Sequence, residues 1–245
     1  MRAMILAAGF GTRLRSLTST VPKALVPVAG RPLIEYGLLF LKSQGIEEVV
    51  INLHHLGEKI RAALGDGSVY GLRIIYSPED PILETGGGIK KAQAFLDGET
   101  FVVLNCDTIL DLDLSALLTT HRKSSAVATL VLRPDSEAAR YGIVETNSGG
   151  RIRRFLGQPA EVSEPLSPYM FTGCQVLEPR IFTFMPAEKP FSTTRETYPQ
   201  MLRAGEPLYG FIHTGPWMVV DDAEGVARAT RAIISGQVRL SYLRL

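Results

Sequence analysis

Apolar positions in the first half of the chain follow two alternating periods. Short runs rich in apolar and β-branched residues predict buried strands, and between them apolar residues recur at helical spacing. Pro32 lies where a first helical turn begins, and Gly45 lies where that helix ends. The predicted strands are 3–8, 47–53, 72–77 and 101–106, and the predicted helices are 33–45, 57–67 and 86–96. This alternation is typical of βαβ units with a parallel sheet.

After about residue 135 the pattern becomes rich in short strands. The predicted strands there are 141–146, 150–156 and 169–177, followed by 207–213 and 217–220. Thr193 and Glu196 have the spacing of a capping box at the start of a helix that ends at Gly205. A final helix is predicted over 222–236, so we expect a single domain, 1–245, with a β-rich lobe.

The composition is that of an ordinary globular protein, with 45% hydrophobic and 21% charged residues in 245. A net charge of +1 provides no general attraction for nucleic acid or an anionic membrane, so an anion would need a local site. The apolar N-terminal run is too short for a signal peptide or a membrane span, and we expect a cytoplasmic protein. Cys106 and Cys174, the two cysteines, are expected to be buried free thiols.

The segment "AGFGTRLRSLT" at 8–18 lies after the first strand, at the sheet edge where open α/β folds bind ligands. Gly9 and Gly11 allow the backbone to approach an oxygen-rich ligand, and Arg13 and Lys23 add charges that suit phosphate. We interpret this segment as a polyphosphate cradle. Leu14 excludes the G-x-G-x-x-G fingerprint, and no Gly-Lys-Ser/Thr triplet is present. A glycine-rich turn with solvated basic side chains is the alternative.

A longer pattern resembles the sugar-1-phosphate nucleotidylyltransferases. It consists of "LAAGFGTRLRSLTSTVPKALVPVAGRPLIEY", "YSPEDPILETGGGI", "VVLNCD", "YGIVE", "RIRRFLGQP", "FTGCQV" and "GEPLYGFIHTGPW", in the family's order. The nearest resemblance is to short bacterial members, which include N-acetylmuramate-1-phosphate uridylyltransferases and mannose-1-phosphate and heptose-1-phosphate guanylyltransferases. The resemblance implies a Rossmann-like, GT-A-like α/β fold whose mixed, mostly parallel sheet is flanked by helices, with a smaller β-rich sugar-binding lobe. It also implies an NTP-binding part at about 1–135 and a sugar-binding, closing part at about 136–245.

The implied reaction is NTP plus sugar 1-phosphate giving NDP-sugar plus pyrophosphate, by direct attack on the α-phosphorus with Mg²⁺. Such an enzyme would supply nucleotide sugars, for example for cell-envelope polysaccharide. Its substrates would be small molecules, it would have no nucleic-acid or membrane partner, and it could form a homo-oligomer. The implied catalytic residues are Arg13, Lys23 and Asp107. The implied nucleotide contacts are Leu6, Ala7, Gly9, Gly11, Thr12, Arg13, Glu79, Gly86 and Gly87. The implied sugar contacts are Gly142, Gln158, Thr172 and Gly173.

Several of these residues also have a plainer interpretation. Asp107, which the resemblance makes a Mg²⁺ ligand, could instead cap the segment that follows it. Gly86 and Gly87 could merely let a helix begin close to the sheet, and Gly142 could belong to a plain turn. The "DLD" of Asp111 to Asp113 matches the D-x-D of metal-dependent glycosyltransferases, although these acids also suit a cap of the helix at 114–121.

The sequence departs from the family pattern at three places. Ser16 replaces a proline, and Gly157 and Gln158 replace an acid and a lysine that grip the sugar and its phosphate. Val219 occupies the position of an aspartate that is the second metal ligand, and valine cannot coordinate Mg²⁺. Asp221 is a candidate substitute, with a cap of the last helix by Asp221 or Asp222 as the alternative. A nucleotide- or NDP-sugar-binding homologue with impaired catalysis is therefore a second hypothesis, and the base, the sugar and the oligomeric state stay open.

Overall fold

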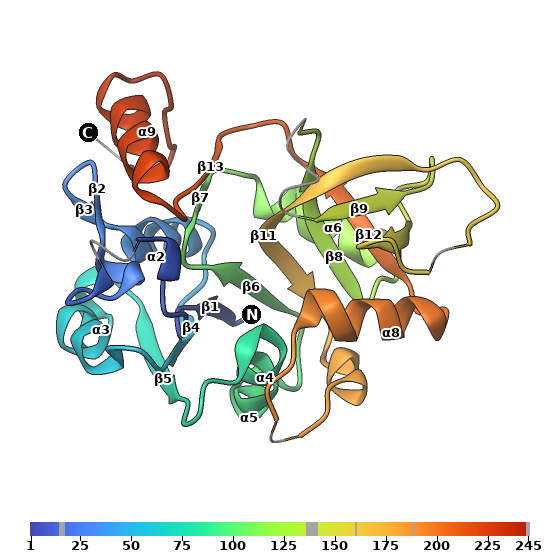
Figure 1. Ribbon diagram of the computed structural model, residues 1–245, viewed down its shortest axis with the longest axis horizontal. Coiled ribbons are helices and arrows are strands. Elements are labelled where there is room, and N and C mark those ends of the chain that lie inside the picture. The colour runs from blue at the N-terminus through green and yellow to red at the C-terminus, as the bar shows by residue number, and fades with distance from the viewer. Residues whose placement is uncertain (15–17, 136–141, 160, 188, 244–245) are drawn as a thin grey trace. The chain divides into compact units, whose positions relative to one another are not determined.

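A computed structural model describes residues 1–14, 18–135, 142–159, 161–187 and 189–243 (Figure 1). The chain divides into two compact units that take interleaved segments. Unit 1 comprises Met1–Ile82, Leu104–Leu112 and Gly215–Leu245, and unit 2 comprises Leu83–Val103 and Asp113–Thr214. These units do not coincide with the parts 1–135 and 136–245, and the roles expected for those two parts stay predictions.

The sheet of unit 1 is parallel. Strand β4 (Glu48–Leu53) pairs with β1 (Ala3–Leu6) on one side and with β5 (Arg73–Pro78) on the other. Most of their side chains are buried, as expected for parallel strands covered on both faces. Because parallel strands end at the same edge of a sheet, the segments that follow β1, β4 and β5 are brought to one edge.

Helices and short ladders complete unit 1. The helices are α2 (Leu33–Ser43), α3 (Gly57–Leu64) and α9 (Ala223–Ile234). The short antiparallel ladders join β2 (Pro27–Val28) to β3 (Arg31–Pro32) and β7 (Thr108–Leu110) to β13 (Trp217–Val219). Residues of α2, β7, β13 and α9 share one buried apolar cluster, so the C-terminal helix is fixed to the N-terminal sheet unit.

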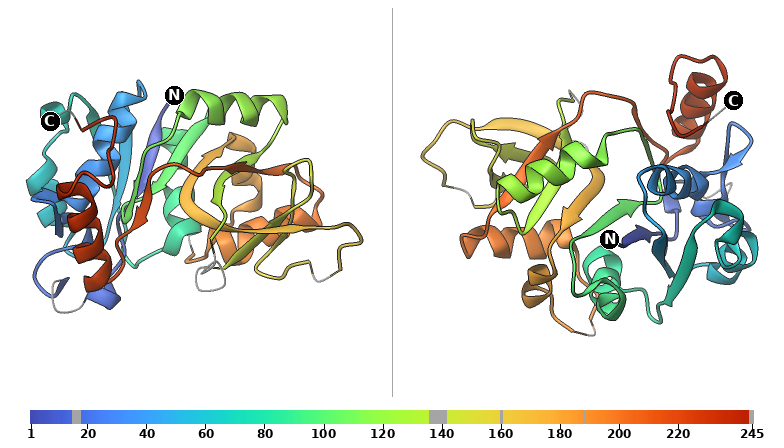
Figure 2. Two further views of the ribbon diagram at one scale, coloured as in Figure 1. Left: turned by 90° about the horizontal axis from the view of Figure 1, so that it is seen from above. Right: turned by 180° about the vertical axis from the view of Figure 1, so that it is seen from behind.

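Unit 2 is richer in antiparallel pairing. Strand β11 (Ser167–Leu177) pairs antiparallel with β8 (Ala128–Arg133) and with β9 (Ile143–Thr146). Strand β9 also pairs antiparallel with β10 (Ile152–Phe155), and β12 (Leu208–Ile212) pairs parallel with β8. The helices are α4 (Glu84–Lys91), α5 (Gln93–Leu96), α6 (Leu114–Lys123) and α8 (Tyr198–Arg203). Helix α6 lies across β8, β11 and β12 (Figure 2), and β6 (Phe101–Asn105) passes from unit 2 into unit 1 at Leu104.

The expected fold class is confirmed, with a mixed, mostly parallel sheet flanked by helices and a β-rich lobe. Three local expectations need correction. The helix predicted over 86–96 is interrupted at Ala92, and β8 was not predicted as a strand. The capping box uses Ser192 instead of Thr193, because an extra residue in a π turn lets the Glu196 carboxylate accept from the Ser192 N–H at 3.0 Å. None of the helices in the described ranges is long and apolar enough to cross a membrane.

Candidate active site

The loop after β1 has the tight backbone that the glycine pattern predicts. Gly11 has a φ of +63°, and a Cβ there would lie 3.0 Å from the Cβ of Lys23 and 3.1 Å from Cγ2 of Thr18. Only glycine meets both demands without strain. A Cβ at Gly9 would meet nothing within 4 Å, so the space beside that backbone is open to a ligand. Thr12 and Arg13 follow in an exposed 3₁₀ turn that ends at Leu14.

Lys23 and Asp107 form an ion pair in unit 1. The Lys23 Nζ lies 2.5 Å from Oδ2 of Asp107, and the two side chains are 13% and 23% exposed. Asp107 lies in the turn between β6 and β7, whose start is tied to β1 because the Cys106 N–H donates to the Leu6 carbonyl at 3.2 Å. The structure thus brings together a cation and a carboxylate separated by 84 residues. The segment that follows Asp107 is the strand β7, so the interpretation of Asp107 as the cap of a following helix is wrong.

Arg13 and Asp221 form a second ion pair in the same unit. The Arg13 Nη1 donates to Oδ2 of Asp221, whose side chain is only 3% exposed, whereas that of Arg13 is 61% exposed. Asp222 is the N-cap of α9, where its carboxylate accepts from the Gly225 N–H at 2.7 Å. Of the two acids proposed as caps, Asp222 is the cap and Asp221 is the partner of the loop arginine.

A buried polar chain connects the ends of the three parallel strands. The Ala7 N–H donates to Oδ1 of Asn52 at 2.7 Å, and Nδ2 of Asn52 donates to Oε1 of Glu79 at 2.7 Å. Asn52 and Glu79 are 2% and 4% exposed. Because an unpaired buried amide or carboxylate is costly, this chain holds Ala7 and Glu79 in place. Sequence reasoning missed Asn52, whose only signal is a lone amide at the end of the apolar run 49–53.

The carboxylates of unit 1 suit a hard cation. Asp107 and Asp221 offer oxygen donors of the kind that Mg²⁺ prefers, with phosphate oxygens and water completing its coordination. The two acids lie near each other along a ladder, because the Val220 N–H donates to the Asp107 carbonyl at 2.9 Å. Val219 pairs with Thr108 in that ladder and contributes no ligand. No group of three or more His, Cys, Asp or Glu side chains that could hold a metal ion occurs within the described ranges.

The two cysteines are free thiols, as predicted. Cys174 is fully buried, and Cys106, next to Asp107, is partly exposed instead of buried. Burial of the sulfur is the main cause that raises the pKa of the Cys106 thiol to about 12, with the Asp107 charge adding to it. A thiol with such a pKa stays protonated near neutral pH and is a poor nucleophile.

In unit 2, Gly86 and Gly87 have a packing role. A Cβ at Gly86 would lie 2.2 Å from the Phe191 ring and 2.9 Å from its carbonyl oxygen. That carbonyl accepts from the N–H groups of both glycines, at 2.9 and 3.3 Å. The glycines thus let α4 begin close to the backbone at Phe191, which lies in no strand, instead of close to the sheet as the plainer interpretation expected. Their contact with a nucleoside stays a prediction.

The predicted sugar residues lie on the strands and turns around β9 and β11. Gly142 has a φ of +97°, and a Cβ there would lie 2.2 Å from Cδ2 of Leu156, so this turn requires glycine. Thr172 is buried, and its hydroxyl donates to the Val131 carbonyl at 2.9 Å. Thr172 and Gly173 lie where the pairing of β11 with β8 shifts register, and such bulges often accompany ligand sites.

Gln158 is exposed and near a cation that sequence reasoning missed. The Arg203 Nη2 lies 3.5 Å from Oε1 of Gln158, at the end of α8. Where the family pattern has a lysine, this chain therefore has a neutral amide beside a guanidinium. Ser16, the first departure from the family pattern, lies outside the described residues.

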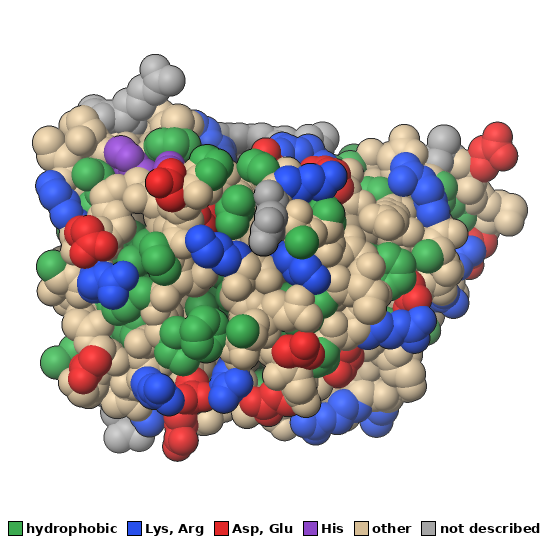
Figure 3. Space-filling view, turned by 90° about the horizontal axis from the view of Figure 1, so that it is seen from below, with side chains coloured by type: hydrophobic (Ala, Val, Ile, Leu, Met, Phe, Trp, Pro, Cys, Tyr) green, Lys and Arg blue, Asp and Glu red, His purple; other side chains and the backbone are tan. Residues whose placement is uncertain are grey.

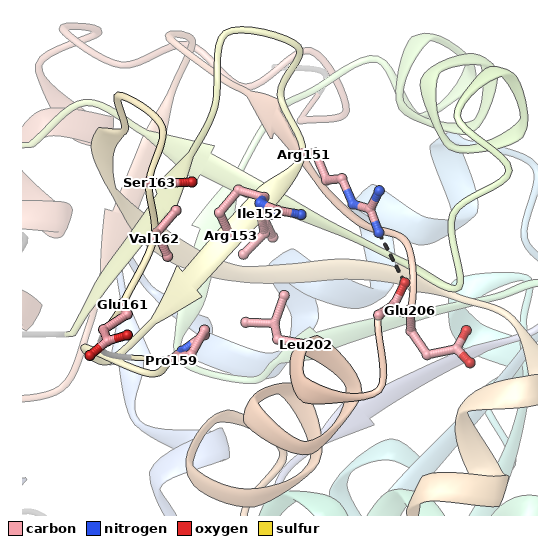
Figure 4. Close-up of a pocket in the computed structure, with 10 residues that line it drawn as sticks. Arg151, Ile152, Arg153, Pro159, Glu161, Val162, Ser163, Leu202 and Glu206 are labelled. Atoms are coloured by element: carbon pink, nitrogen blue, oxygen red, sulfur yellow. Dashed lines mark hydrogen bonds between the residues drawn. The ribbon is translucent and has the colours of Figure 1, made fainter.

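A small cavity of about 170 Å³ lies beside this region of unit 2 (Figure 4). Arg151 and Leu202 line it from opposite sides, and the Arg151 Nη2 donates to the Gly205 carbonyl at 2.9 Å. None of Gly142, Gln158, Thr172 and Gly173 lines this cavity. It is therefore separate from the predicted sugar contacts.

The "DLD" acids have structural partners. Asp113 caps α6 by accepting from the Ser115 and Ala116 N–H groups, at 2.9 and 3.2 Å. Asp111 accepts from the N–H and the hydroxyl of Ser241. These bonds favour the capping interpretation over a glycosyltransferase metal site.

Basic and acidic side chains are interspersed with apolar ones on the face seen in Figure 3. This agrees with the net charge of +1, and it leaves the local pairs of unit 1 as the charges on which nucleotide binding would depend.

Comparison with known proteins identifies the family. The model of a family described as "Nucleotidyl transferase" matches residues 2–235. A UTP–glucose-1-phosphate uridylyltransferase of Synechocystis is 33% identical over 252 residues, which covers 98% of this chain and 65% of that protein. An N-acetylmuramate alpha-1-phosphate uridylyltransferase of Neisseria meningitidis is 53% identical over 121 residues, which covers 49% of this chain and 52% of that protein. The chain thus spans less than two thirds of the length of either relative.

A solved structure has the same fold. HddC from Yersinia pseudotuberculosis, complexed with GMP-PN, superposes with a TM-score of 0.79 at 22% identity, covering 95% of this chain and 99% of that one. At this identity the likeness concerns the fold alone.

Proposed function

Since this chain belongs to the nucleotidyl transferase family, we propose that it is a sugar-1-phosphate nucleotidylyltransferase that converts an NTP and a sugar 1-phosphate into an NDP-sugar and pyrophosphate. The observation that carries the proposal is the Lys23–Asp107 ion pair beside the tight turn at Gly11, in a loop whose backbone is open at Gly9. Relatives of this chain include uridylyltransferases and mannose-1-phosphate guanylyltransferases, so UTP and GTP are the two candidate nucleotides.

Unit 1 would bind the nucleotide. We expect the loop of Gly9, Gly11 and Thr12 to surround the β- and γ-phosphates together with Arg13, whose exposed guanidinium presents a fork of donors. Leu6, Ala7 and Glu79 would lie near the base, on the buried Asn52 framework. Gly86 and Gly87 of unit 2 remain proposed nucleoside contacts.

Lys23 would neutralise charge during the chemical step, which would proceed without a covalent intermediate. An oxygen of the sugar phosphate attacks the α-phosphorus in line, and the pyrophosphate leaves from the opposite side. Positioning and charge neutralisation supply the catalysis, because both reacting groups are anions that repel each other. Lys23 would turn from Asp107 toward the meeting phosphates.

Asp107 would hold a Mg²⁺ ion through its carboxylate, with Asp221 as the second ligand in place of an aspartate at 219. Mg²⁺, when bound, neutralises phosphate charge and fixes the geometry of the triphosphate. Binding of the cation–nucleotide pair would release Lys23 and Arg13 from their acids, so each cation would exchange a carboxylate partner for a phosphate.

The sugar 1-phosphate would bind to unit 2 through Gly142, Gln158, Thr172 and Gly173. Because Gln158 replaces the lysine of the family pattern, we expect the phosphate of the sugar 1-phosphate to bind weakly. We expect small-molecule partners, a cytoplasmic reaction and no partner nucleic acid, and we make no choice of oligomeric state.

The proposal is tested by an activity panel. The chain is incubated with Mg²⁺, each of five NTPs and the 1-phosphates of glucose, mannose, heptose and N-acetylmuramate, and pyrophosphate release is measured. The expected result is release with UTP or GTP and one or two of the sugars. Nucleotide binding without release for any pair would support the second candidate, a binding homologue, which the loss of a carboxylate at Val219 favours.

A further inference from the structure

Glu79, the acid expected near the base, is held by three consecutive residues at the end of β4. Its N–H donates to the Leu53 carbonyl at 2.7 Å, and its Oε1 accepts from Nδ2 of Asn52 at 2.7 Å. The Glu79 carbonyl lies 3.0 Å from Nδ1 of His54. A carbonyl oxygen only accepts, so Nδ1 of His54 carries the hydrogen and donates it. Backbone and side chain of Glu79 are thus both fixed from β4 before any ligand binds.

The imidazole of His54 also contacts the glycine-rich loop. Phe10 lies between the two loop glycines and is 46% exposed. Its ring centroid lies 5.4 Å from that of His54, and the two ring planes meet at 88°. This is the edge-to-face geometry that aromatic pairs favour. His55 makes a second contact with the Phe10 ring, tilted at 46° and also 5.4 Å between centroids. The tip of the loop is therefore fixed to the residues that follow β4.

These two contacts connect the two ends of the expected nucleotide site. Phe10 belongs to the loop that would surround the triphosphate, and Glu79 would lie near the base. One ribose joins the base to the triphosphate in a nucleotide, so both ends bind together only when the protein holds them at a matching separation. A separation that is set before binding reduces the ordering cost of binding. His54 is the residue that touches both ends, one through its ring and the other through its Nδ1 hydrogen.

We propose that His54 is a positioning residue of the nucleotide site, which holds the phosphate-binding loop and Glu79 in register through Phe10 and the Glu79 carbonyl. The inference rests on the proposed function and extends it, because the motifs that carry the family resemblance do not include His54. His54 would contact no reacting atom. It should therefore act on the affinity for the nucleotide and on the choice of base.

Two variants of His54 each keep one of its contacts. In His54→Asn the side-chain amide can still donate to the Glu79 carbonyl, but the ring beside Phe10 is lost. In His54→Phe a ring remains beside Phe10, but a carbon replaces Nδ1 and the hydrogen bond is lost. The full chain is titrated calorimetrically with the Mg²⁺ complexes of inorganic triphosphate, UTP, GTP and ATP. Base discrimination is the Kd for ATP divided by the Kd for the better bound of UTP and GTP.

The two variants should fail in different ways. His54→Phe should lower base discrimination about three- to tenfold, as expected for one lost hydrogen bond, and leave the Kd for inorganic triphosphate unchanged. His54→Asn should raise the Kd for inorganic triphosphate about three- to tenfold, as expected for one lost aromatic pair, and leave base discrimination unchanged. A merely structural role would change both quantities in both variants.

Phe10→Leu tests the same contact from the loop. Because Phe10 is 46% exposed, this variant should melt close to the wild type. It should weaken inorganic triphosphate as much as His54→Asn does, and the double variant should be no weaker than either single one. His55→Phe is the matched control, because it also replaces an imidazole beside Phe10 but leaves the His54 bond to Glu79 in place. It should leave base discrimination unchanged, and thermal melting checks the fold of every variant.

The inference is overturned if base discrimination in His54→Phe, or the Kd for inorganic triphosphate in His54→Asn, equals that of the wild type. Loss of both quantities in both variants would also overturn it, since a loosened end of β4 would then explain the result. No binding of any NTP to the wild-type chain would overturn the proposed function together with this inference. Unchanged variants of a chain that does bind NTP would overturn the inference alone.

Discussion

In unit 1 four of the residues predicted for the site are charged and form two ion pairs, whereas in unit 2 the predicted sugar residues are glycines, a buried hydroxyl and a neutral amide. Lys23 and Arg13 each hold a carboxylate partner. Thr172 bonds to the backbone, and Gly142 is required by its turn. Unit 1 thus presents charges that can act on phosphates, whereas the residues predicted to bind the sugar in unit 2 carry no charge.

The largest expected effect tests the charge in unit 1. Lys23→Ala should lower the turnover for pyrophosphate release about 10²–10³-fold, because it removes the cation that would offset charge where two phosphates meet. The free energy of unfolding should change little, since Asp107 is 23% exposed and can be solvated. Lys42→Ala, an exposed lysine of α2, is the matched control and should leave turnover unchanged. Near-normal turnover in Lys23→Ala would remove Lys23 from the chemistry.

The second prediction uses the unequal burial of the Arg13–Asp221 pair. Arg13→Gln leaves a carboxylate that is 3% exposed without its cation, and it should lower the free energy of unfolding by about 1–3 kcal/mol. Asp221→Asn leaves an arginine that is 61% exposed and already in water, so its cost should stay below about 1 kcal/mol.

Urea unfolding of both variants measures this asymmetry. An equal loss of unfolding free energy in the two variants would mean that the Arg13–Asp221 pair does not persist in solution. The difference in charge between the two units would then depend on Lys23 alone. A larger loss for Asp221→Asn would indicate that Asp221 has a structural partner besides Arg13.

The sequence predicts those parts of unit 1 whose residues belong to a motif or to an apolar run of neighbouring positions. The loop glycines, Lys23 and Asp107 belong to one continuous signature, and the apolar runs around them predict strands whose ends share one edge. Asn52 and Asp221 could not be placed in this way. Each acts through a partner far along the chain, and the Arg13–Asp221 pair joins residues 208 positions apart.

In unit 2 the sequence predicts less. Antiparallel pairings and register shifts decide the positions of Gly142, Thr172 and Gly173, and neither follows from apolar periodicity. The strand β8 has the composition of a buried strand but lacks a motif, and it was overlooked. The N-cap is Ser192 and not the predicted Thr193, because the helix begins with a π turn, which has one more residue than the i, i+3 spacing of a capping box allows for.

The third prediction restores charge to unit 2. Gln158→Lys should lower the KM for the sugar 1-phosphate about tenfold and leave the KM for the NTP unchanged, since one charge-assisted contact is worth about 1.5–3 kcal/mol before repulsion from Arg203. Gln158→Leu, which adds no charge, should not lower it. Steady-state kinetics with each substrate varied separately makes the measurement. An unchanged KM in Gln158→Lys would place residue 158 away from the sugar phosphate.

The smallest effect concerns a buried histidine that gives unit 2 a pH response of its own. His121 is 1% exposed, with its Nδ1 2.8 Å from the Thr129 hydroxyl and its Nε2 2.9 Å from Oε1 of Glu178. Burial is the largest effect on its pKa and lowers it from the ordinary 6.5, while the Glu178 contact raises it and the Arg122 charge lowers it. In the unfolded chain His121 takes up a proton at a higher pH than in the folded one. Its contribution to stability is therefore intact above pH 6.5 and is lost as the pH falls through 6.5 toward the folded pKa.

Replacing His121 removes this titration and leaves that of the other groups in place. The free energy of unfolding, measured in urea between pH 7.5 and 5.5, should fall less steeply with decreasing pH in His121→Gln than in the wild type. Because both proteins share every other titrating group, the difference between their slopes isolates His121. Identical slopes would mean that His121 is protonated as easily in the folded chain as in the unfolded one. In that case the carboxylate of Glu178 would cancel the effect of burial on the pKa of His121.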